Sequence, residues 1–233
     1  MTFHTATNLP GGKFMDSDFW LERWQNNEIG FHQAEVNLHL QEYWNRLQAP
    51  AGGTILVPLC GRTRDMLWLR AQGYRILGVE LSPIAVRDFF AENRLAVQVT
   101  ARPPFDRWES DGITLLRGDF FDLAEVDTSD VVAVYDRAAL IALPHEMRAD
   151  YVAKLVALLP PHAQMLLVVM EYPEAEMPGP PFPVAENEVR LLYEGRYEVE
   201  HLYTKDILDE NPRFRARGLT RLVEKVFHLR PHR

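Results

Sequence analysis

The stretch TILVPLCGRTRDMLWLRAQGYRILGVELS, residues 54–82, contains the pattern that decides the fold. An apolar β run stops at Cys60-Gly61, a helical stretch follows and ends at Gly73, and a second β run covers residues 75–79. Two strands joined through a helix by short connections must form a parallel crossover unit. Ligands of such units bind beyond the carboxyl ends of the strands.

The second β run delivers a carboxylate, Glu80, to the end at which a ligand is expected. In nucleotide-binding units an acidic residue about 20 positions after the turn accepts hydrogen bonds from ribose hydroxyls. A dinucleotide-binding turn has the pattern G-x-G-x-x-G, whereas this turn has one glycine, Gly61. The pattern therefore favours S-adenosylmethionine, which carries a ribose but no phosphate. In the alternative interpretation, Gly61 merely ends a strand and Glu80 is a surface carboxylate.

Composition and charge narrow the class of protein. The net charge of the 233-residue chain is −8, which argues against a nucleic-acid substrate and for a small molecule. Cys60 is the single cysteine, so no intrachain disulfide can form, and no apolar stretch approaches membrane-spanning length. No signal-peptide pattern is present, so we expect a cytoplasmic protein without a membrane partner, and nothing demands more than a monomer.

The chain length suits one large α/β domain. Residues 1–14 lack periodicity and contain Pro-Gly-Gly, which predicts a flexible tail before a single domain over residues 15–233. Within that domain, residues 15–50 are expected to form helices that cap the active site. Trp20 and Trp24 share one face of the first helix, where aromatic side chains belong more often to a core than to a cofactor pocket.

The rest of the chain predicts the remainder of the sheet. Three apolar runs, at residues 113–116, 130–135 and 164–170, predict parallel strands. Two stretches of alternating apolar and polar residues, 197–203 and 219–229, predict an antiparallel hairpin at the sheet edge. Together these elements predict an α/β three-layer sandwich, Rossmann-like, with a mostly parallel seven-stranded sheet that ends in the hairpin. That architecture fits a methyltransferase better than the all-parallel sheet of a dehydrogenase.

Two segments between the predicted strands carry no regular pattern. Residues 100–111, which include Pro103-Pro104, are predicted to be irregular. The proline-rich residues 173–183 form a loop too long for a simple connection, so we expect a rim or lid over the site.

Candidate site residues follow two of the strands. Asp136 and Arg137 come after a buried strand, so both are expected to face the ligand, with Arg137 beside an anionic substrate; the alternative is a structural ion pair. Asp119 and Phe120 can bind an adenine amine and ring, or can serve as a turn cap and a core residue. The histidines show no metal-binding spacing, so no metal is expected.

Several stretches, taken in order, resemble the thiopurine S-methyltransferases in their bacterial form. The single-glycine PLCG turn, the W-x-x-x-W…G-F-H spacing and DRAAL are not general methyltransferase features. The stretches are FWLERWQNNEIGFHQ (19–33), VPLCGRTRDMLWLRAQGYRILGVELS (57–82), FFDL (120–123), YDRAAL (135–140) and GLTRLVEKVFHL (218–229).

The resemblance implies a class I S-adenosylmethionine-dependent enzyme that methylates the sulfur of a thiopurine or another aromatic or heterocyclic thiol. It implies an adenine site at Asp119 and Phe120, and the remaining cofactor contacts at Trp24, Leu59, Glu80 and Arg137. Substrate contacts are implied at Phe31 and Arg213. In catalysis, Arg137 is expected to favour the ionised thiol, and Asp136 to orient Arg137.

Three alternatives stay open at this stage. The natural acceptor could be a selenium or tellurium species, in which case the enzyme would serve metalloid detoxification. The protein could bind S-adenosylmethionine without catalysing a reaction. It could also be a nicotinamide-dependent oxidoreductase, which the missing glycines and the terminal hairpin disfavour.

Overall fold

The centre of the fold is a nine-stranded sheet with the strand order β3-β4-β5-β2-β1-β6-β7-β9-β8. We describe residues 17–30 and 32–232 of a computed structural model; the predicted tail, residues 1–14, lies outside the described residues. The strands are β1 (Thr54–Val57), β2 (Arg75–Glu80), β3 (Gln98–Arg102), β4 (Phe105–Ser110), β5 (Ile113–Arg117), β6 (Val131–Arg137), β7 (Gln164–Glu171), β8 (Tyr197–Asp206) and β9 (Val223–Pro231).

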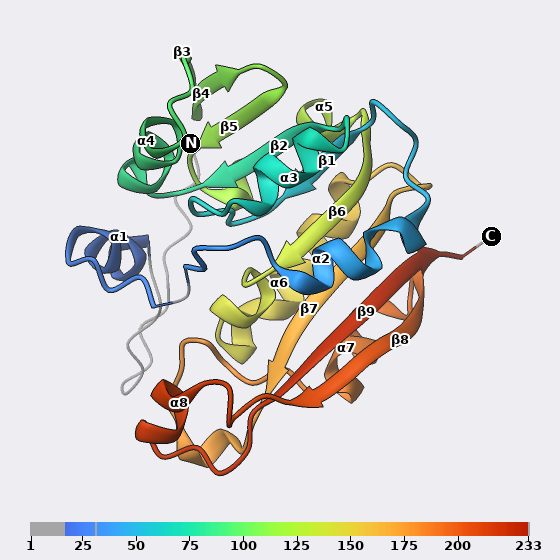
Figure 1. The fold of residues 1–233 in the computed structure, drawn as a ribbon. Helices are drawn as coiled ribbons and strands as arrows, with labels where there is room; N and C mark the ends of the chain where they lie inside the picture. The colour runs from blue at the N-terminus through green and yellow to red at the C-terminus, as the bar shows by residue number, and fades with distance from the viewer. Residues whose placement is uncertain (1–16, 31, 233) are drawn as a thin grey trace, which may run out of the picture.

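The predicted α/β sandwich is confirmed, with a parallel centre and antiparallel edges. Strands β5, β2, β1, β6 and β7 pair in parallel, and β8 and β9 form the predicted antiparallel hairpin, with β9 against β7. The loop between β8 and β9 is long enough to hold helix α8 (Pro212–Ala216), which lies at the lower end of Figure 1.

The predicted number of seven strands was wrong, because residues 98–110 form an additional hairpin, β3–β4, on β5. The prediction of an irregular segment over residues 100–111 was wrong for the same reason. All five residues of β3 are exposed, so this edge strand has no buried face and its sequence lacks the apolar alternation that reveals a strand.

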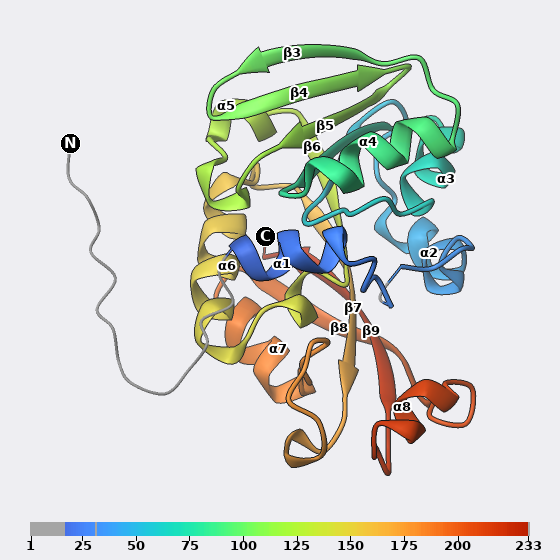
Figure 2. The same cartoon turned by 90° about the vertical axis from the view of Figure 1, so that its left-hand side faces the viewer.

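Helices cover both faces of the sheet, as Figure 2 shows. One face carries α2 (Leu38–Tyr43), α3 (Asp65–Ala71) and α4 (Pro83–Glu92). The other carries α5 (Glu125–Thr128), α6 (His145–Leu158) and α7 (Glu186–Tyr193). The first helix, α1 (Ser17–Gln25), belongs to neither layer and lies across the carboxyl ends of the parallel strands.

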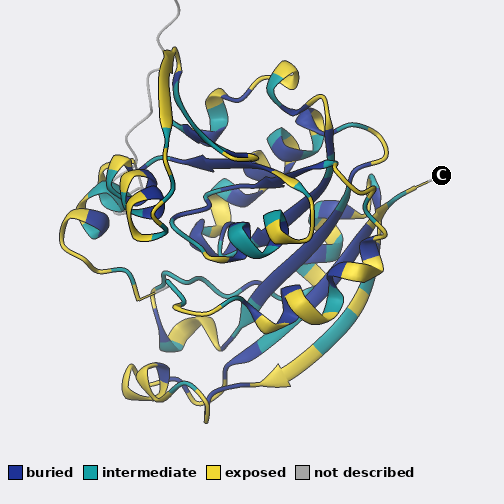
Figure 3. Ribbon diagram, turned by 45° about the horizontal axis from the view of Figure 1, so that its top comes forward, coloured by how far each residue is buried: buried dark blue, intermediate teal, exposed yellow. Residues whose placement is uncertain are grey.

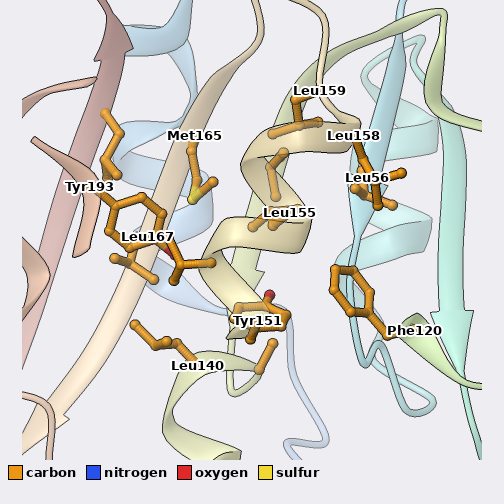
Figure 4. Packing of buried hydrophobic residues seen from close by; sticks show 14 of the residues in the cluster. Leu56, Phe120, Leu140, Tyr151, Leu155, Leu158, Leu159, Met165, Leu167 and Tyr193 are labelled. Atoms are coloured by element: carbon orange, nitrogen blue, oxygen red, sulfur yellow. The ribbon is translucent and has the colours of Figure 1, made fainter. Parts of the chain in front are cut away.

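The two helical layers bury two separate apolar clusters, one on each face of the sheet. Successive residues of β1 alternate between them: Leu56 packs under α6, whereas Ile55 and Val57 pack under α3 and α4. The central strands are therefore buried on both faces, as the dark ribbons of Figure 3 show. In Figure 4 the α6 residues Tyr151 and Leu155 lie between Leu167 on one side and Phe120 on the other.

The described part of the chain contains no helix that is long and apolar enough to cross a membrane. Over the same residues, no group of three or more histidine, cysteine, aspartate and glutamate side chains is arranged to hold a metal ion.

Candidate active site

A cavity of about 430 Å³ opens at the carboxyl ends of the parallel strands. The parallel crossover unit in the sequence predicts a ligand site at this edge of the sheet. That volume suits a drug-sized ligand. Its walls come from α1, from the turns after β1, β2, β5 and β6, from β7 and β9, and from α8. Seven predicted site residues meet in it: Trp24, Leu59, Glu80, Asp119, Phe120, Arg137 and Arg213.

Glu80 ends β2 and is buried, with 7% of its surface exposed. Its Oε2 accepts a hydrogen bond from the amide of Gly61 at 2.8 Å, and its Oε1 accepts one from the amide of Ser82 at 2.7 Å. Burial raises the pKa of Glu80, whereas the backbone donors oppose that rise. The alternative of a surface carboxylate is therefore wrong: the two turns hold Glu80 at the cavity wall.

The backbone of this turn, and that of the turn after β6, is left-handed at non-glycine residues. Leu59 has a φ of 46° and Ala138 a φ of 66°, and both line the cavity. Such conformations cost energy for a residue with a Cβ and are concentrated at functional sites. Leu59 directly precedes Cys60-Gly61, and Ala138 directly follows Arg137.

Arg137, at the end of β6, is paired with a carboxylate that the sequence reasoning missed. Its Nη2 lies 3.1 Å from Oδ2 of Asp65 and 3.2 Å from Oγ1 of Thr63. Asp65, the first residue of α3, is fully buried and also accepts from the amide of Asn37 at 2.8 Å and from the hydroxyl of Tyr135 at 3.1 Å. Arg137 therefore forms a structural ion pair and also lies at the cavity wall.

Asp136 does not face the cavity, and the expectation that Asp136 and Arg137 face the same ligand is corrected. Because β6 extends to Arg137, these neighbours point to opposite faces of the sheet. Asp136 is fully buried; it accepts from the hydroxyl of Tyr151 at 2.8 Å and from the amide of Leu140 at 3.2 Å. The carboxylate that orients Arg137 is Asp65.

Burial raises the pKa of Asp136 to about 6, above the ordinary aspartate value that it regains on unfolding. The folded protein then binds this proton more tightly than the unfolded chain. The contribution of Asp136 to stability is complete below pH 4 and falls by about 3 kcal/mol as the pH rises through 6. Asp136→Asn should not show this fall, because the amide can bond both Leu140 and Tyr151 without titrating.

Urea unfolding of both proteins between pH 4 and 7 measures the effect. The stability of Asp136→Asn relative to the parent protein should rise with pH over this window. A difference that stays constant with pH would show that Asp136 does not titrate there.

Asp119 and Phe120 line the cavity wall on the β5 side. Oδ1 of Asp119 accepts from the amide of Phe121 at 2.9 Å, so this residue also caps its turn. Phe120 is buried, and its ring centroid lies 4.9 Å from that of Tyr151. The structural alternative from the sequence is therefore confirmed, with Asp119 as a turn cap and Phe120 as a core residue, and both residues also contribute to the cavity wall. Tyr151, which sequence reasoning missed, links this wall to Asp136.

The opposite wall is rich in arginine. Arg213 donates to the carbonyl of Gly30, and Arg213 and Arg217 place their guanidinium carbons 4.8 and 5.9 Å from the ring centroid of Phe214. Within residues 17–30 and 32–232, neither arginine has a carboxylate partner. Burial and the charge of Arg217 lower the pKa of Arg213. Arg217 was not predicted.

Other wall residues come from the two regions expected to cover the site. Trp20 and Trp24 of α1 line the cavity, as do Pro180 and Pro181 of the proline-rich loop, and Phe31 lies outside the described residues. His32 also lines it, and burial together with the charge of Arg62 lowers the pKa of this histidine.

Comparison with known proteins places the chain beside one family of methyltransferases. Residues 15–232 match the family described as thiopurine S-methyltransferase (TPMT). A thiopurine S-methyltransferase of Nitrosospira multiformis is 51% identical over 215 residues, which cover 92% of this chain and 98% of the relative. One from Methylococcus capsulatus is 49% identical over 217 residues, covering 93% and 98%.

Among solved structures, the fold is similar to that of the 1,6-didemethyltoxoflavin-N1-methyltransferase of Burkholderia thailandensis with bound S-adenosylhomocysteine. The TM-score is 0.60 at 16% identity, and the match covers 92% of this chain and 87% of the other. These comparisons favour S-adenosylmethionine over the nicotinamide alternative.

Proposed function

The chain belongs to the thiopurine S-methyltransferase family of S-adenosylmethionine-dependent methyltransferases, and on that premise we propose that it methylates the sulfur atom of an aromatic or heterocyclic thiol. The observation that supports a thiol acceptor is the group of arginine side chains at the cavity wall. Arg137, Arg213 and Arg217 line the cavity, and the part of the cavity nearest to them would favour a small anionic acceptor over a neutral one.

The residues of the β2 side fit S-adenosylmethionine. Glu80 has two oxygens with lone pairs left after the bonds to Gly61 and Ser82, as a ribose diol requires. We propose that Glu80 binds the ribose, that Asp119 and Phe120 contact the adenine, and that Trp24, Leu59 and Arg137 contact the rest of the cofactor. When bound, the cofactor supplies a methyl group on a positively charged sulfur.

The chain itself would contribute alignment and charge rather than a strong base. Aromatic thiols are acidic enough to be largely thiolate near neutral pH, and the thiolate is the nucleophile. Arg137, held by Asp65 and Thr63, would stabilise that thiolate at the centre of the cavity. Helix α1 and the loop at Pro180-Pro181 would cap the site and exclude water, within one domain that covers residues 15–233.

Asp136 receives a different role from the one first expected. Because its carboxylate binds Tyr151 and the turn at Leu140, we propose that it positions the adenine-side wall rather than Arg137. It therefore acts outside the reacting groups.

Methyl transfer from labelled S-adenosylmethionine to 6-mercaptopurine tests the proposal, with a selenium acceptor in parallel. Turnover of the thiol is the expected result. Turnover of the selenium species alone would replace the thiol by a metalloid acceptor. If neither acceptor is methylated although the cofactor binds tightly, thiol methylation is wrong and a non-catalytic role gains support.

Gly61 offers a further prediction, because its φ of 54° is left-handed and a Cβ there would lie 3.4 Å from the Trp24 ring. Gly61→Ala should lower the free energy of unfolding by about 1–2 kcal/mol through backbone strain. It should also weaken S-adenosylhomocysteine binding, because the new methyl group, in van der Waals contact with Trp24, takes up space at the cavity wall.

Gly52→Ala is the matched control, since Gly52 has a φ of 74° and open space around its Cβ position. Its stability should fall by a similar amount, while calorimetry should find unchanged affinity for S-adenosylhomocysteine. Equal losses of affinity in both variants would remove the special role of the Gly61–Trp24 contact.

A further inference from the structure

A histidine–glutamate pair lies behind the arginine-rich wall and is not used by the reaction as described. Nε2 of His39, on α2, lies 2.6 Å from Oε2 of Glu224, on β9. Their side chains are 10% and 13% exposed. Glu224 lines the cavity, whereas His39 supports it from outside.

The surroundings of the histidine decide where the proton lies. Nδ1 of His39 is buried and has no hydrogen-bond partner within the described ranges. A proton on Nδ1 would bury a donor without an acceptor, which is costly. Nε2 therefore carries a proton and donates it to Oε2 of Glu224. The ring also packs against Tyr203, with centroids 4.5 Å apart.

This arrangement leaves Glu224 with one free oxygen. His39 binds Oε2, and no described residue forms a hydrogen bond with Oε1. Because the carboxylate belongs to the cavity wall and its other oxygen is held in place, Oε1 is a fixed hydrogen-bond acceptor for a ligand.

Strand order places this acceptor far from the proposed ribose site. In the sequence β2-β1-β6-β7-β9, Glu80 is on β2, Arg137 is on β6 in the middle, and Glu224 is on β9 opposite Met170 of β7. Met170 also lines the cavity. A molecule that contacts Glu224 therefore occupies the half of the cavity that contains Arg213 and Arg217.

We propose that Glu224 anchors the methyl acceptor by accepting a hydrogen bond from a ring N–H, and that His39 is a positioning residue that holds the carboxylate. This inference rests on the proposed thiol methylation and narrows its acceptor class. The arginines select an ionised sulfur, and Glu224 selects a heterocycle that keeps an N–H after the sulfur has ionised. Simple aryl thiols lack that second group.

Calorimetric titration of the protein loaded with S-adenosylhomocysteine tests the anchor without requiring turnover. The two probes are 2-mercaptobenzimidazole, whose anion keeps one ring N–H, and 2-mercaptobenzothiazole, which has sulfur at that position. In Glu224→Gln the affinity for the benzimidazole should fall about 10- to 100-fold, as expected for the loss of a hydrogen bond to a charged group. The fall for the benzothiazole should be at least tenfold smaller.

Glu198→Gln is the control, because Glu198 pairs with Arg230 on the exposed edge of the sheet and lies outside the cavity. It should change neither affinity. The proposed anchor would be overturned if Glu224→Gln lost affinity equally for both probes or lost none. It would also be overturned if the parent protein bound neither probe. If the parent binds the probes with the expected selectivity but methylates neither, the proposed function fails and the anchor survives.

Variants of His39 separate positioning from folding. His39→Leu removes the donor to Oε2, so the ratio of its affinity for 2-mercaptobenzimidazole to its affinity for 2-mercaptobenzothiazole should fall most of the way to that of Glu224→Gln. His39→Gln keeps an N–H at a similar reach and should restore the ratio of the parent protein. If Glu224→Gln does not fold, this pair carries the same test, and equal selectivity in the leucine and glutamine variants would contradict the positioning role.

Discussion

Arg137→Ala is expected to lower the free energy of unfolding by about 3 kcal/mol and to reduce methylation of ionised thiols most strongly. Removing one partner of a buried ion pair costs about 3–5 kcal/mol, because the other charge stays buried. Asp65 keeps its donors from Asn37 and Tyr135, which favours the lower end of that range. Urea unfolding measures the loss.

A double-mutant cycle with Asp65→Asn isolates the pair. In the Arg137→Ala background this second change should cost less than it does alone, because the amide needs no opposite charge. Additive losses would mean that the two side chains do not stabilise each other, despite their separation of 3.1 Å.

The catalytic part of the prediction concerns charge. Steady-state kinetics should give a larger fall in kcat/KM for a thiol that is ionised at the assay pH than for one that is neutral. Arg137→Lys keeps a positive charge but not the planar guanidinium, and should retain part of the difference. Equal falls for both thiols would remove Arg137 from the stabilisation of the thiolate.

Glu80→Ala is expected to weaken the binding of S-adenosylhomocysteine by about 1–3 kcal/mol, or roughly 5- to 150-fold. The variant loses the carboxylate proposed to bind the ribose. It also leaves the amides of Gly61 and Ser82 without their acceptor, so the turn after β1 should become less stable. Calorimetry measures the affinity, and urea unfolding measures the stability.

An analogue of S-adenosylhomocysteine without ribose hydroxyls separates the two effects. If Glu80 binds the ribose, parent and variant should bind this analogue with similar affinity. Glu109→Ala is the control, since its carboxylate pairs with Arg107 away from the cavity, and it should change neither affinity. An undiminished affinity of Glu80→Ala for S-adenosylhomocysteine would exclude Glu80 from the ribose site.

The parts of the site that could be predicted are those set by short-range pattern. Gly61, Glu80 and Arg137 follow or end strands whose apolar runs are visible in the sequence, and strand ends in a parallel sheet meet at one edge. Asp136 was misplaced because the predicted strand stopped at residue 135. Once β6 continues to Arg137, the two-residue period of a strand directs Asp136 to the other face.

The partners of these residues could not be predicted. Asp65 is 72 positions from Arg137, and His39 is 185 positions from Glu224. Nothing in the local pattern distinguishes these side chains from other polar residues at a helix start or in an alternating strand. The β3–β4 hairpin escaped prediction because an exposed edge strand needs no apolar face.

The sequence by itself determined the crossover unit, the edge of the sheet that holds the site, the carboxylate at the end of β2 and the family. Periodicity and turn chemistry are local properties, and they are written into neighbouring residues. Only the tertiary structure decided that Asp65 holds Arg137, that Asp136 supports Tyr151, and that His39 meets Glu224. These pairings depend on strand order and on how the helices pack on the sheet, which bring distant segments together to bury their apolar faces.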